Sequence, residues 1–290
     1  MKGIVLAGGS GTRLKPMTNV ISKQLLPVYD KPLVYYAIST LMIAGIKEIL
    51  IISSPESIES YKSLLENFYE LGVDLYFETQ EKPEGIAQAF IVGEKFIGKD
   101  DCMLILGDNL FFGHDLSLML KSAIKNNKGA TVFGYRVSDP ERYGIIEFDS
   151  SGHPVDICEK PAIPKSSYAV TGIYIYSNKV VNYAKSLKPS TRGELEITDI
   201  NKIYLDNNNL KVDIMGRGFT WLDTGTPESL LEAGQFVHTL EKRQGLKVAC
   251  PEEISWRNGW ISKEKIKLIA NNFNSEYGSY LSSIIEEKIF

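Results

Sequence analysis

The chain has 290 residues, of which 43% are hydrophobic and 23% charged, and its formal net charge at pH 7 is −4. That composition is typical of a globular protein with an ample core, and the absence of a long basic run argues against nucleic acid as the main partner. Cys102, Cys158 and Cys250 show neither a disulfide framework nor zinc spacing, so we expect a reducing, cytoplasmic setting. No stretch approaches the roughly 20 apolar residues of a membrane span, and the first residues lack a secretory h-region, so no membrane partner is expected.

The first half of the chain alternates short apolar runs with longer helical patterns. Residues 3–6 predict a buried first strand, which a glycine-rich turn follows directly. Further strands are expected at residues 48–52, 73–78, 103–106 and 130–135, and helices at residues 33–44, 55–68, 87–96 and 116–126. Because strands that alternate with helices form parallel sheets covered on both faces, this half predicts a three-layer α/β fold with a mainly parallel central sheet.

After residue 135, the expected strands no longer alternate with helices. Residues 145–148, 154–159 and 169–176 are strand-like with little room for helices between them, so we expect antiparallel additions to the sheet. Helical patterns return at residues 196–205, a plain turn follows at 207–209, and helices dominate after Pro227. The pattern predicts one core over residues 1–225 and a helical C-terminal appendage over residues 226–290.

The strongest motif is the glycine-rich turn after the first expected strand. Its small residues Gly8, Gly9 and Gly11 let backbone N–H groups approach an anion closely. The carboxyl end of a parallel strand is also where ligands collect. The alternative is a tight turn that binds nothing.

Two familiar phosphate loops do not fit this motif. A Walker A loop needs Gly-Lys-Ser/Thr where Gly11-Thr12-Arg13 stands, and the dinucleotide fingerprint needs a glycine where Leu14 stands. What remains is a glycine loop with its own arginine and with Lys23 ten residues on. Two cations beside such a loop suit a polyphosphate better than a dinucleotide.

Here the sequence resembles a known family. Residues 8–14, Gly-Gly-Ser-Gly-Thr-Arg-Leu, followed by Pro16, Lys23 and Pro27, match the G-G-x-G-T-R-L-x-P…K-x-x-x-P signature of sugar nucleotidyltransferases. Residues 15–32 look like the thymidylyltransferase branch in particular, and the likeness continues to the C-terminus. The resemblance implies a Rossmann-like nucleotidyltransferase fold in which residues 1–225 form the catalytic core and residues 226–290 serve oligomerisation and regulation.

Two aspartates are candidates for a metal site. Asp108 comes just past an apolar strand, where an Asx turn would be the ordinary explanation. Mg²⁺ prefers a few carboxylate oxygens with phosphate and water, so a single aspartate makes a poor site. Asp223, in the segment Trp221-Leu222-Asp223, is a second candidate. The resemblance implies that Asp108 and Asp223 together hold Mg²⁺.

The expected sugar side centres on Glu159 and Lys160, which end a predicted strand. A solvated charge pair is the usual explanation for such a dipeptide, but the resemblance assigns the sugar phosphate to Lys160 and a sugar hydroxyl to Glu159. The turn Arg142-Tyr143-Gly144 also matches the family. Core packing would ordinarily explain the tyrosines; the resemblance implies a sugar pocket lined by Tyr143, Gly144, Glu159, Lys160, Val170 and Tyr174.

On the base side, Gln80 and residues 83–87 match the family pattern Q-x-x-P-x-G-x-A. A glutamine amide can pair with an imide edge as donor and acceptor at once. Thymine and uracil then fit similarly. The contact with the 5-methyl group is worth about 1 kcal/mol, which allows roughly tenfold discrimination between the two bases at most. The implied nucleotide-binding residues are Leu6, Gly8, Gly9, Gly11, Thr12, Arg13, Gln24, Gln80, Gly85 and Asp108.

The resemblance implies an activity. Thymidylyl would pass from dTTP to α-D-glucose 1-phosphate, giving dTDP-glucose and pyrophosphate, as the first step of dTDP-sugar synthesis of the dTDP-rhamnose type. Attack would be direct and in line, because the scattered histidines match no nucleophile–base pattern. The implied catalytic residues are Arg13, Lys23, Asp108, Lys160 and Asp223.

Three alternatives remain open. A related nucleotidyltransferase would use UTP, CTP or another hexose 1-phosphate. A GT-A-like glycosyltransferase usually carries D-x-D after a strand, whereas Asp100-Asp101-Cys102 precedes the expected strand here. A nucleotide-sensing regulatory module need not keep both metal ligands, and this chain has both.

The resemblance also implies assembly and control. The family pattern predicts a homotetramer with a second nucleotide site at a subunit interface, and the matching residues are Gly113, His114, Arg217, Ile254 and Arg257. The alternative for residues 251–259 is a loop joining two helices, with Trp256 as a packing residue and Arg257 solvated.

Overall fold

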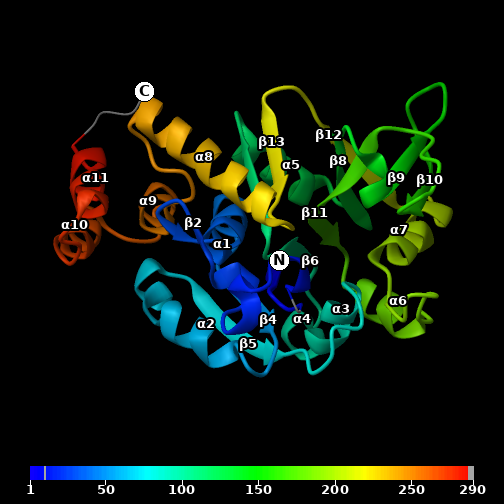
Figure 1. Ribbon diagram of the computed structural model, residues 1–290, viewed down its shortest axis with the longest axis horizontal. Coiled ribbons are helices and arrows are strands. Elements are labelled where there is room, and N and C mark those ends of the chain that lie inside the picture. The colour runs from blue at the N-terminus through cyan, green and yellow to red at the C-terminus, as the bar shows by residue number, and fades with distance from the viewer. Residues whose placement is uncertain (10, 287–290) are drawn as a thin grey trace.

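The computed structural model describes residues 1–9 and 11–286, so Ser10 of the glycine motif and residues 287–290 lie outside the described residues. Within those ranges a nine-stranded sheet runs through the molecule, and helices lie on both of its faces (Figure 1). The predicted three-layer α/β fold is confirmed. No helix of the described ranges is long and apolar enough to cross a membrane.

The parallel part of the sheet is built as expected. β1 (Lys2–Leu6) lies between β6 (Cys102–Leu106) and β4 (Glu48–Ser53), and β5 (Asp74–Thr79) follows β4 on the outside. All of these pairings are parallel, and Leu6 stands opposite both Ile52 and Leu106. The carboxyl ends of the strands therefore meet at one edge, where the glycine loop leaves β1.

The antiparallel additions are also confirmed. β11 (Tyr168–Tyr176) pairs antiparallel with β6 and extends the sheet to β8 (Ala130–Arg136), β9 (Gly144–Phe148) and β10 (Pro154–Glu159). β12 (Leu210–Met215) adds a strand parallel to β8. The β11–β8 register shifts between Val170 and Tyr174, which marks a bulge or irregularity in that pairing.

The two faces of the sheet bury separate cores. Side chains along β1 alternate between the two faces, and Val5 lies on the face covered by α1 (Val34–Ile43), α2 (Ile58–Leu64) and α5 (Leu116–Asn126). Ile4 points to the opposite face, which is covered by α3 (Gln88–Val92), α6 (Val180–Ser186) and α7 (Ile197–Asp206). A strand buried on both faces reads as a continuous apolar run, which is why these strands were recognisable in the sequence.

Between residues 227 and 286 the chain is mainly helical, as predicted. α8 (Pro227–Gln244) begins at a capping box between Thr226 and Ser229 and ends at Gly245, where φ is 70°. It is followed by α9 (Pro251–Arg257), α10 (Lys263–Asn271) and α11 (Glu276–Ile284). α9 packs on α1, while α10 and α11 lie at the end of the molecule opposite β9 and β10 (Figure 1). A division between residues 225 and 226 stays a prediction.

Two expected helices are interrupted. The pattern at 55–68 becomes α2 and a 3₁₀ turn at Glu66–Leu71, and the pattern at 87–96 becomes α3 and α4 (Glu94–Ile97). The second break falls at Gly93, whose backbone packs so closely that a Cβ would lie 3.0 Å from the carbonyl oxygen of Ala89. Glycine also lowers helix stability at that point.

Several short elements were not predicted. They include the ladder of β7 (Asn109–Gly113) with β13 (Phe219–Asp223), the strand β12, the helix α6 and the small ribbon of β2 (Pro27–Val28) with β3 (Lys31–Pro32). Single 3₁₀ turns occur at Thr12–Leu14, Met17–Asn19, Lys23–Leu25 and Pro140–Arg142. The β7–β13 ladder matters most, because one metal candidate, Asp223, ends β13 and the other, Asp108, directly precedes β7.

Candidate active site

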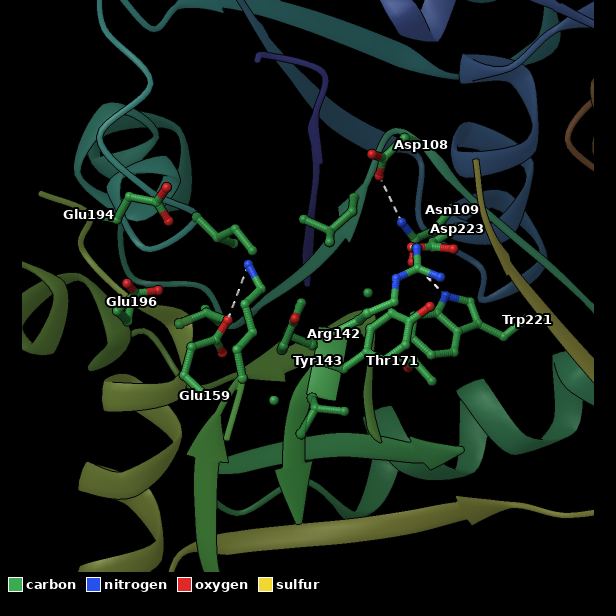
Figure 2. Close-up of a pocket in the computed structure, with 18 of the residues that line it drawn as sticks. Asp108, Asn109, Arg142, Tyr143, Glu159, Thr171, Glu194, Glu196, Trp221 and Asp223 are labelled. Carbon is green, nitrogen blue, oxygen red and sulfur yellow. Dashed lines mark hydrogen bonds and ion pairs between the residues drawn. The ribbon is translucent and has the colours of Figure 1, made fainter. Parts of the chain in front are cut away.

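Two adjoining cavities open at the carboxyl ends of the parallel strands. The larger has a volume of about 450 Å³ and the smaller about 230 Å³. Arg13 and Asp108 line both cavities and so mark their junction. Figure 2 shows the larger cavity, with Asp108 and Asp223 on one side and Glu159, Glu194 and Glu196 on the other.

The glycine loop forms the wall of the smaller cavity. Gly9 and Gly11 both have positive φ, 111° and 54°, a region that L side chains rarely adopt. Thr18 ties the loop back by donating from Oγ1 to the carbonyl of Gly11 at 2.7 Å. The cavity is lined by Gly8, Gly9, Gly11, Thr12, Arg13, Leu14, Lys23, Gln24, Asp108 and Gly225. The structure therefore brings the small-residue loop and the two cations to one cavity.

Lys23 lies between the loop and the first metal candidate. Its side chain is buried, with the residue only 7% exposed, and its Nζ donates to Oδ2 of Asp108 at 2.6 Å. Asp108 stands in the turn that joins β6 to β7. A buried ammonium needs a charged partner, and Asp108 supplies one at the junction of the two cavities.

The second metal candidate is held close to the first by the β7–β13 ladder. Asp223 at the end of β13 faces Asn109, the residue after Asp108. Thr224 then donates to the carbonyl oxygen of Asp108 from its N at 3.1 Å and from its Oγ1 at 2.9 Å. Two aspartates that are 115 residues apart in the chain therefore line one cavity.

The cations near Asp223 do not fully offset the effects of its burial and of the neighbouring Asp108 on its carboxyl pKa. Burial is the largest cause that raises the pKa of the Asp223 carboxyl, and the nearby Asp108 raises it further. Arg142, whose Nη2 lies 3.3 Å from Oδ2 of Asp223, opposes this, as does Lys23, but the pKa stays above its ordinary value. A divalent cation between the carboxylates would relieve that repulsion.

The donor set fits Mg²⁺ with substrate oxygens. Among residues 1–9 and 11–286, no group of three or more His, Cys, Asp or Glu side chains could hold a metal by itself. Asp108 and Asp223 would supply two carboxylates, and phosphate and water would fill the remaining positions. Mg²⁺ characteristically binds in this way rather than in an all-protein cage.

The residues expected on the base side lie beside the glycine loop. Gln24 and Gln80 are both buried, and Gln24 donates from Nε2 to the carbonyl of Gly8 at 3.3 Å. A Cβ on Gly8 would lie 2.7 Å from Oε1 of Gln80, so a larger residue there would displace the Gln80 amide. Leu6, Gln80 and Gly85 border the cavities without lining either, as far as the structure describes the chain.

Gly85 has a structural role that the sequence did not reveal. Its φ is +107°, and a Cβ there would clash with the backbone of Leu195. The loop around it is bonded to Leu195, which donates to the carbonyl of Glu84 at 2.7 Å and accepts from the amide of Ala87 at 3.2 Å. The expected base-side loop is thereby joined to the segment that carries Glu194 and Glu196.

The residues expected on the sugar side come together in the larger cavity, lined by Tyr143, Gly144, Glu159, Lys160, Val170 and Tyr174 among others. Gly144 faces Glu159 across the β9–β10 pair, and the Lys160 amide donates to the carbonyl of Tyr143 at 2.9 Å. Oε2 of Glu159 accepts from Oγ1 of Thr198 at 2.6 Å. Burial raises the pKa of Tyr143 and of Tyr174, so both phenols remain hydrogen-bond donors.

Sequence reasoning missed several residues of this cavity. Arg192 lies in the segment between α6 and α7, with its Nη2 2.8 Å from Glu196, 3.3 Å from Glu194 and 3.5 Å from Glu159. The run Arg192-Gly193-Glu194-Leu195-Glu196 is conspicuously charged, which was the available signal. Other missed lining residues are Ile86, Leu106, Asn109, Arg142, Thr171, Gly172, Ile197 and Trp221.

The residues matched to a regulatory site are only partly brought together. Gly113, Ile254 and Arg257 line a separate cavity of about 430 Å³. Arg257 there pairs with Glu253 at 2.6 Å. His114 points outward, with its side chain 93% exposed and its Nε2 3.3 Å from Asp115, and Arg217 does not line this cavity. Since Gly113 ends β7 and Asn109 begins it, one strand connects the two sites.

Comparison with known proteins identifies the family of the chain. The family model described as "Nucleotidyl transferase" matches residues 2–239. The glucose-1-phosphate thymidylyltransferase of Neisseria meningitidis serogroup A is 54% identical over 288 residues, which cover 99% of this chain and 100% of the relative. The enzyme of the same name from Mycobacterium tuberculosis is 50% identical over 287 residues, 99% of each chain.

Solved structures agree as well. A Bacillus anthracis protein assigned as a glucose-1-phosphate thymidylyltransferase superposes with a TM-score of 0.76 at 44% identity, covering 81% of this chain and 94% of that one. A UDP-glucose pyrophosphorylase complexed with UDP-glucose superposes with a TM-score of 0.72 at 26% identity, covering 82% and 98%. The chain belongs to the nucleotidyl transferase family.

Proposed function

We propose that this protein transfers a thymidylyl group from dTTP to α-D-glucose 1-phosphate and releases dTDP-glucose and pyrophosphate. One observation carries the proposal: a glycine loop with two cations and a pocket with Glu159 and Lys160 adjoin at Asp108. The nucleotide and the sugar are those of the relatives, which are glucose-1-phosphate thymidylyltransferases. In this proposal dTDP-glucose enters the synthesis of dTDP-sugars of the dTDP-rhamnose type.

The smaller cavity takes the triphosphate in this proposal. Backbone N–H groups of the glycine loop surround the phosphates, and Arg13 at the junction holds the leaving pyrophosphate through its planar fork. Lys23 neutralises charge near the α-phosphate from its buried position beside Asp108. Gln24, Gln80 and Gly85, with Leu6, form the side that meets the base.

The larger cavity takes the sugar phosphate. Lys160 binds its phosphate and Glu159 accepts from a sugar hydroxyl, while Tyr143, Gly144, Val170 and Tyr174 form the walls. Arg192 adds a second cation to this end. Lys160 Nζ lies 3.7 Å from Oε1 of Glu159, so these two neighbouring residues can contact the phosphate and a nearby hydroxyl of the hexose 1-phosphate together.

The chemistry needs positioning more than proton transfer. A sugar phosphate has a second pKa of roughly 6, so it is largely dianionic at neutral pH and needs no general base. Its oxygen forms a bond to the α-phosphorus while the bond to the β-phosphate oxygen breaks on the opposite side. Arg13, Lys23 and Lys160 hold the reacting groups in line and offset the charge that develops.

Asp108 and Asp223 would hold Mg²⁺ in this proposal. When bound, the ion supplies positive charge to the phosphate oxygens. The chain's own contribution is to keep the two carboxylates together through the β7–β13 ladder and Thr224.

A second candidate function stays within the same reaction class. A glutamine amide pairs with the imide edge that thymine and uracil share, and a UDP-glucose pyrophosphorylase has the same fold at 26% identity. A uridylyltransferase, or an enzyme for another hexose 1-phosphate, is therefore the alternative.

A comparison of substrates separates these candidates. We expect kcat/KM with glucose 1-phosphate to be highest for dTTP and lower for UTP by about tenfold at most. The same assay with other hexose 1-phosphates tests the sugar. A strong preference for CTP, ATP or GTP would contradict the proposed function.

We also propose regulation and assembly beyond the catalytic site. The cavity of Gly113, Ile254 and Arg257 would bind a sugar nucleotide at an interface of a cytoplasmic homotetramer, with His114 and Arg217 completing it. Residues 226–290 would then form the oligomerisation and regulatory region beside a catalytic core of residues 1–225. The supporting observation is that α9 supplies both Ile254 and Arg257 to this cavity.

A further inference from the structure

A chain of hydrogen bonds leads from Trp221 to the carboxylate of Asp108. The indole Nε1 of Trp221 donates to Oδ1 of Asn109 at 2.6 Å, and Nδ2 of Asn109 donates to Oδ1 of Asp108 at 2.7 Å (Figure 2). Asn109 is only 2% exposed and Trp221 only 9%. Buried bonds of this kind hold side chains in one arrangement, because leaving any partner unpaired is costly.

The chemistry of the indole fixes the direction of the chain. An indole N–H can only donate, so the amide atom that faces Trp221 must be the oxygen of Asn109. The amide nitrogen then faces Asp108 and can only donate to it. The hydrogen-bond partners of Asn109 thus assign its amide oxygen and nitrogen without ambiguity, and the nitrogen is the atom that faces the carboxylate.

The surroundings are shaped around this amide. A Cβ on Gly172 of β11 would clash with Oδ1 of Asn109. The amide of Asn109 therefore fits beside β11 because residue 172 is glycine. Trp221 is in turn held between Tyr135 and Tyr143, with ring centroids 5.9 Å and 5.1 Å away. The indole therefore cannot easily leave its acceptor.

The two oxygens of Asp108 thus have different partners. Oδ1 accepts from Asn109, and Oδ2 accepts from Lys23 at 2.6 Å. A carboxylate has about four lone-pair sites, so two bonds fix its plane and still leave lone pairs for a cation. A side chain that turned freely would have to be ordered each time a metal bound.

We propose that Asn109 is a positioning residue that orients the metal-binding carboxylate of Asp108, and that Trp221 fixes the amide of Asn109 for this purpose. The inference rests on the proposed function, since it takes Asp108 as a metal ligand. Partners that orient metal ligands typically govern metal affinity by 10- to 100-fold, by the general pattern of such outer contacts.

The test is Mn²⁺ binding to the enzyme–dTTP complex, measured by electron paramagnetic resonance. Asn109→Leu keeps a similar volume but removes the donor, and we expect it to weaken Mn²⁺ binding on the order of 10- to 100-fold. Trp221→Phe keeps an aromatic ring but removes the N–H, and should weaken binding in the same direction by less. The double variant should bind like Asn109→Leu alone, because Trp221 acts through Asn109.

Two further measurements make the result specific. Tyr135→Phe removes a bond of 3.3 Å from its hydroxyl to the carbonyl of Phe219 while keeping its ring against Trp221, so Mn²⁺ binding should stay at the wild-type value. In Asn109→Leu, the KM for glucose 1-phosphate should change less than the Kd for Mn²⁺. A change in that KM alone would mean that Asn109 contacts the sugar instead, and would overturn the proposal.

The remaining outcomes are also decisive. A folded Asn109→Leu protein with wild-type Mn²⁺ affinity overturns the proposal, and additive effects in the double variant overturn the role of Trp221. Should Asn109→Leu fail to fold, Trp221→Phe decides the matter: unchanged Mn²⁺ affinity overturns the proposal and weakened affinity supports it. Failure of the proposed metal site looks different, because then the wild-type complex binds no Mn²⁺ or Asp108→Asn binds it equally well.

Discussion

Lys23 and Asp108, 85 residues apart in the chain, form an ion pair of 2.6 Å between Nζ and Oδ2 where the two cavities meet. The pair joins the loop after β1 to the turn after β6, the two neighbouring strands whose carboxyl ends coincide. It places a cation and an anion together at the point where, in our proposal, the α-phosphate is attacked.

The first prediction concerns the two aspartates. Asp108→Asn and Asp223→Asn should each lower kcat by about 100-fold or more, the usual size of losing one preorganised electrostatic contact. The fold should persist, because the ladder and Thr224 hold the backbone of both residues, although Asp108→Asn should also lower stability by removing the charged partner of the buried Lys23. Steady-state rates in Mg²⁺, with circular dichroism as a control for folding, measure this. Near-normal turnover in either variant would show that the metal assignment is wrong.

The second prediction concerns Arg13. Arg13→Ala should lose about 3 kcal/mol of transition-state stabilisation, by analogy with a lost oxyanion donor. Because its side chain is exposed at the junction of the cavities, the change should leave stability near the wild-type value. Arg13→Lys is the matched control, since it keeps the charge without the planar fork and should recover part of kcat/KM. Equal kcat/KM in wild type and Arg13→Ala would remove Arg13 from the mechanism.

The third prediction concerns a buried ionic cluster between the β2–β3 ribbon and α8. Glu241 contacts Lys247 at 2.6 Å and Lys31 at 3.5 Å, and its side chain is only 5% exposed. Breaking a buried pair from one side typically costs 3–5 kcal/mol, so Glu241→Gln should lower the free energy of unfolding by about 3 kcal/mol. Urea unfolding at pH 7 measures the difference, and a change below about 1 kcal/mol, the range of surface pairs, would contradict it.

The fourth prediction gives this cluster a pH dependence. Burial tends to raise the pKa of Asp30, but the ammonium groups of Lys31 and Lys247 outweigh it and hold that pKa below its ordinary value. A carboxyl with a lowered folded-state pKa adds stability above its unfolded pKa of about 3.9 and loses it as the pH falls through the folded pKa. Asp30→Asn should therefore lower the free energy of unfolding at pH 7. Below pH 4 the difference in this free energy between the variant and the wild type should become smaller. Unfolding curves with a constant gap at both pH values would contradict the assignment.

The fifth prediction concerns control by a product. If Arg257 belongs to a regulatory site, the end-product sugar nucleotide should inhibit, and Arg257→Ala should relieve inhibition with kcat near the wild-type value. Inhibitor and substrate should weaken each other's binding equally if the inhibition acts on affinity. Light scattering should show four subunits. A monomer with simple competitive inhibition, unchanged in Arg257→Ala, would refute this proposal and leave the catalytic one intact.

Local patterns predicted the parallel half of the fold well, because doubly buried strands such as residues 48–52 are continuous apolar runs. β12 alternates apolar and polar residues over Leu210–Met215, a local pattern that is typical of a half-buried strand. β7 and β13 are different, since each is short and is defined by a partner about 110 residues away. No local pattern contains that pairing.

The residues of the site likewise differ in whether a local sequence pattern reveals them. The glycine loop, Lys23 and both aspartates were recognisable because their chemistry is encoded in short motifs. Arg192 was not, because its contacts with Glu159 and Glu196 arise only when an irregular segment folds over the cavity. The role of Gly172 is likewise visible only beside Asn109.

The most direct test of the central claim is the identity of the product. The purified protein is incubated with dTTP, glucose 1-phosphate and Mg²⁺, and the phosphorus-containing products are resolved by ³¹P nuclear magnetic resonance. Our account predicts dTDP-glucose and pyrophosphate in equal amounts, and neither product when EDTA removes the metal. Pyrophosphate without a sugar nucleotide, or dTDP-glucose formed at an undiminished rate in EDTA, would contradict it.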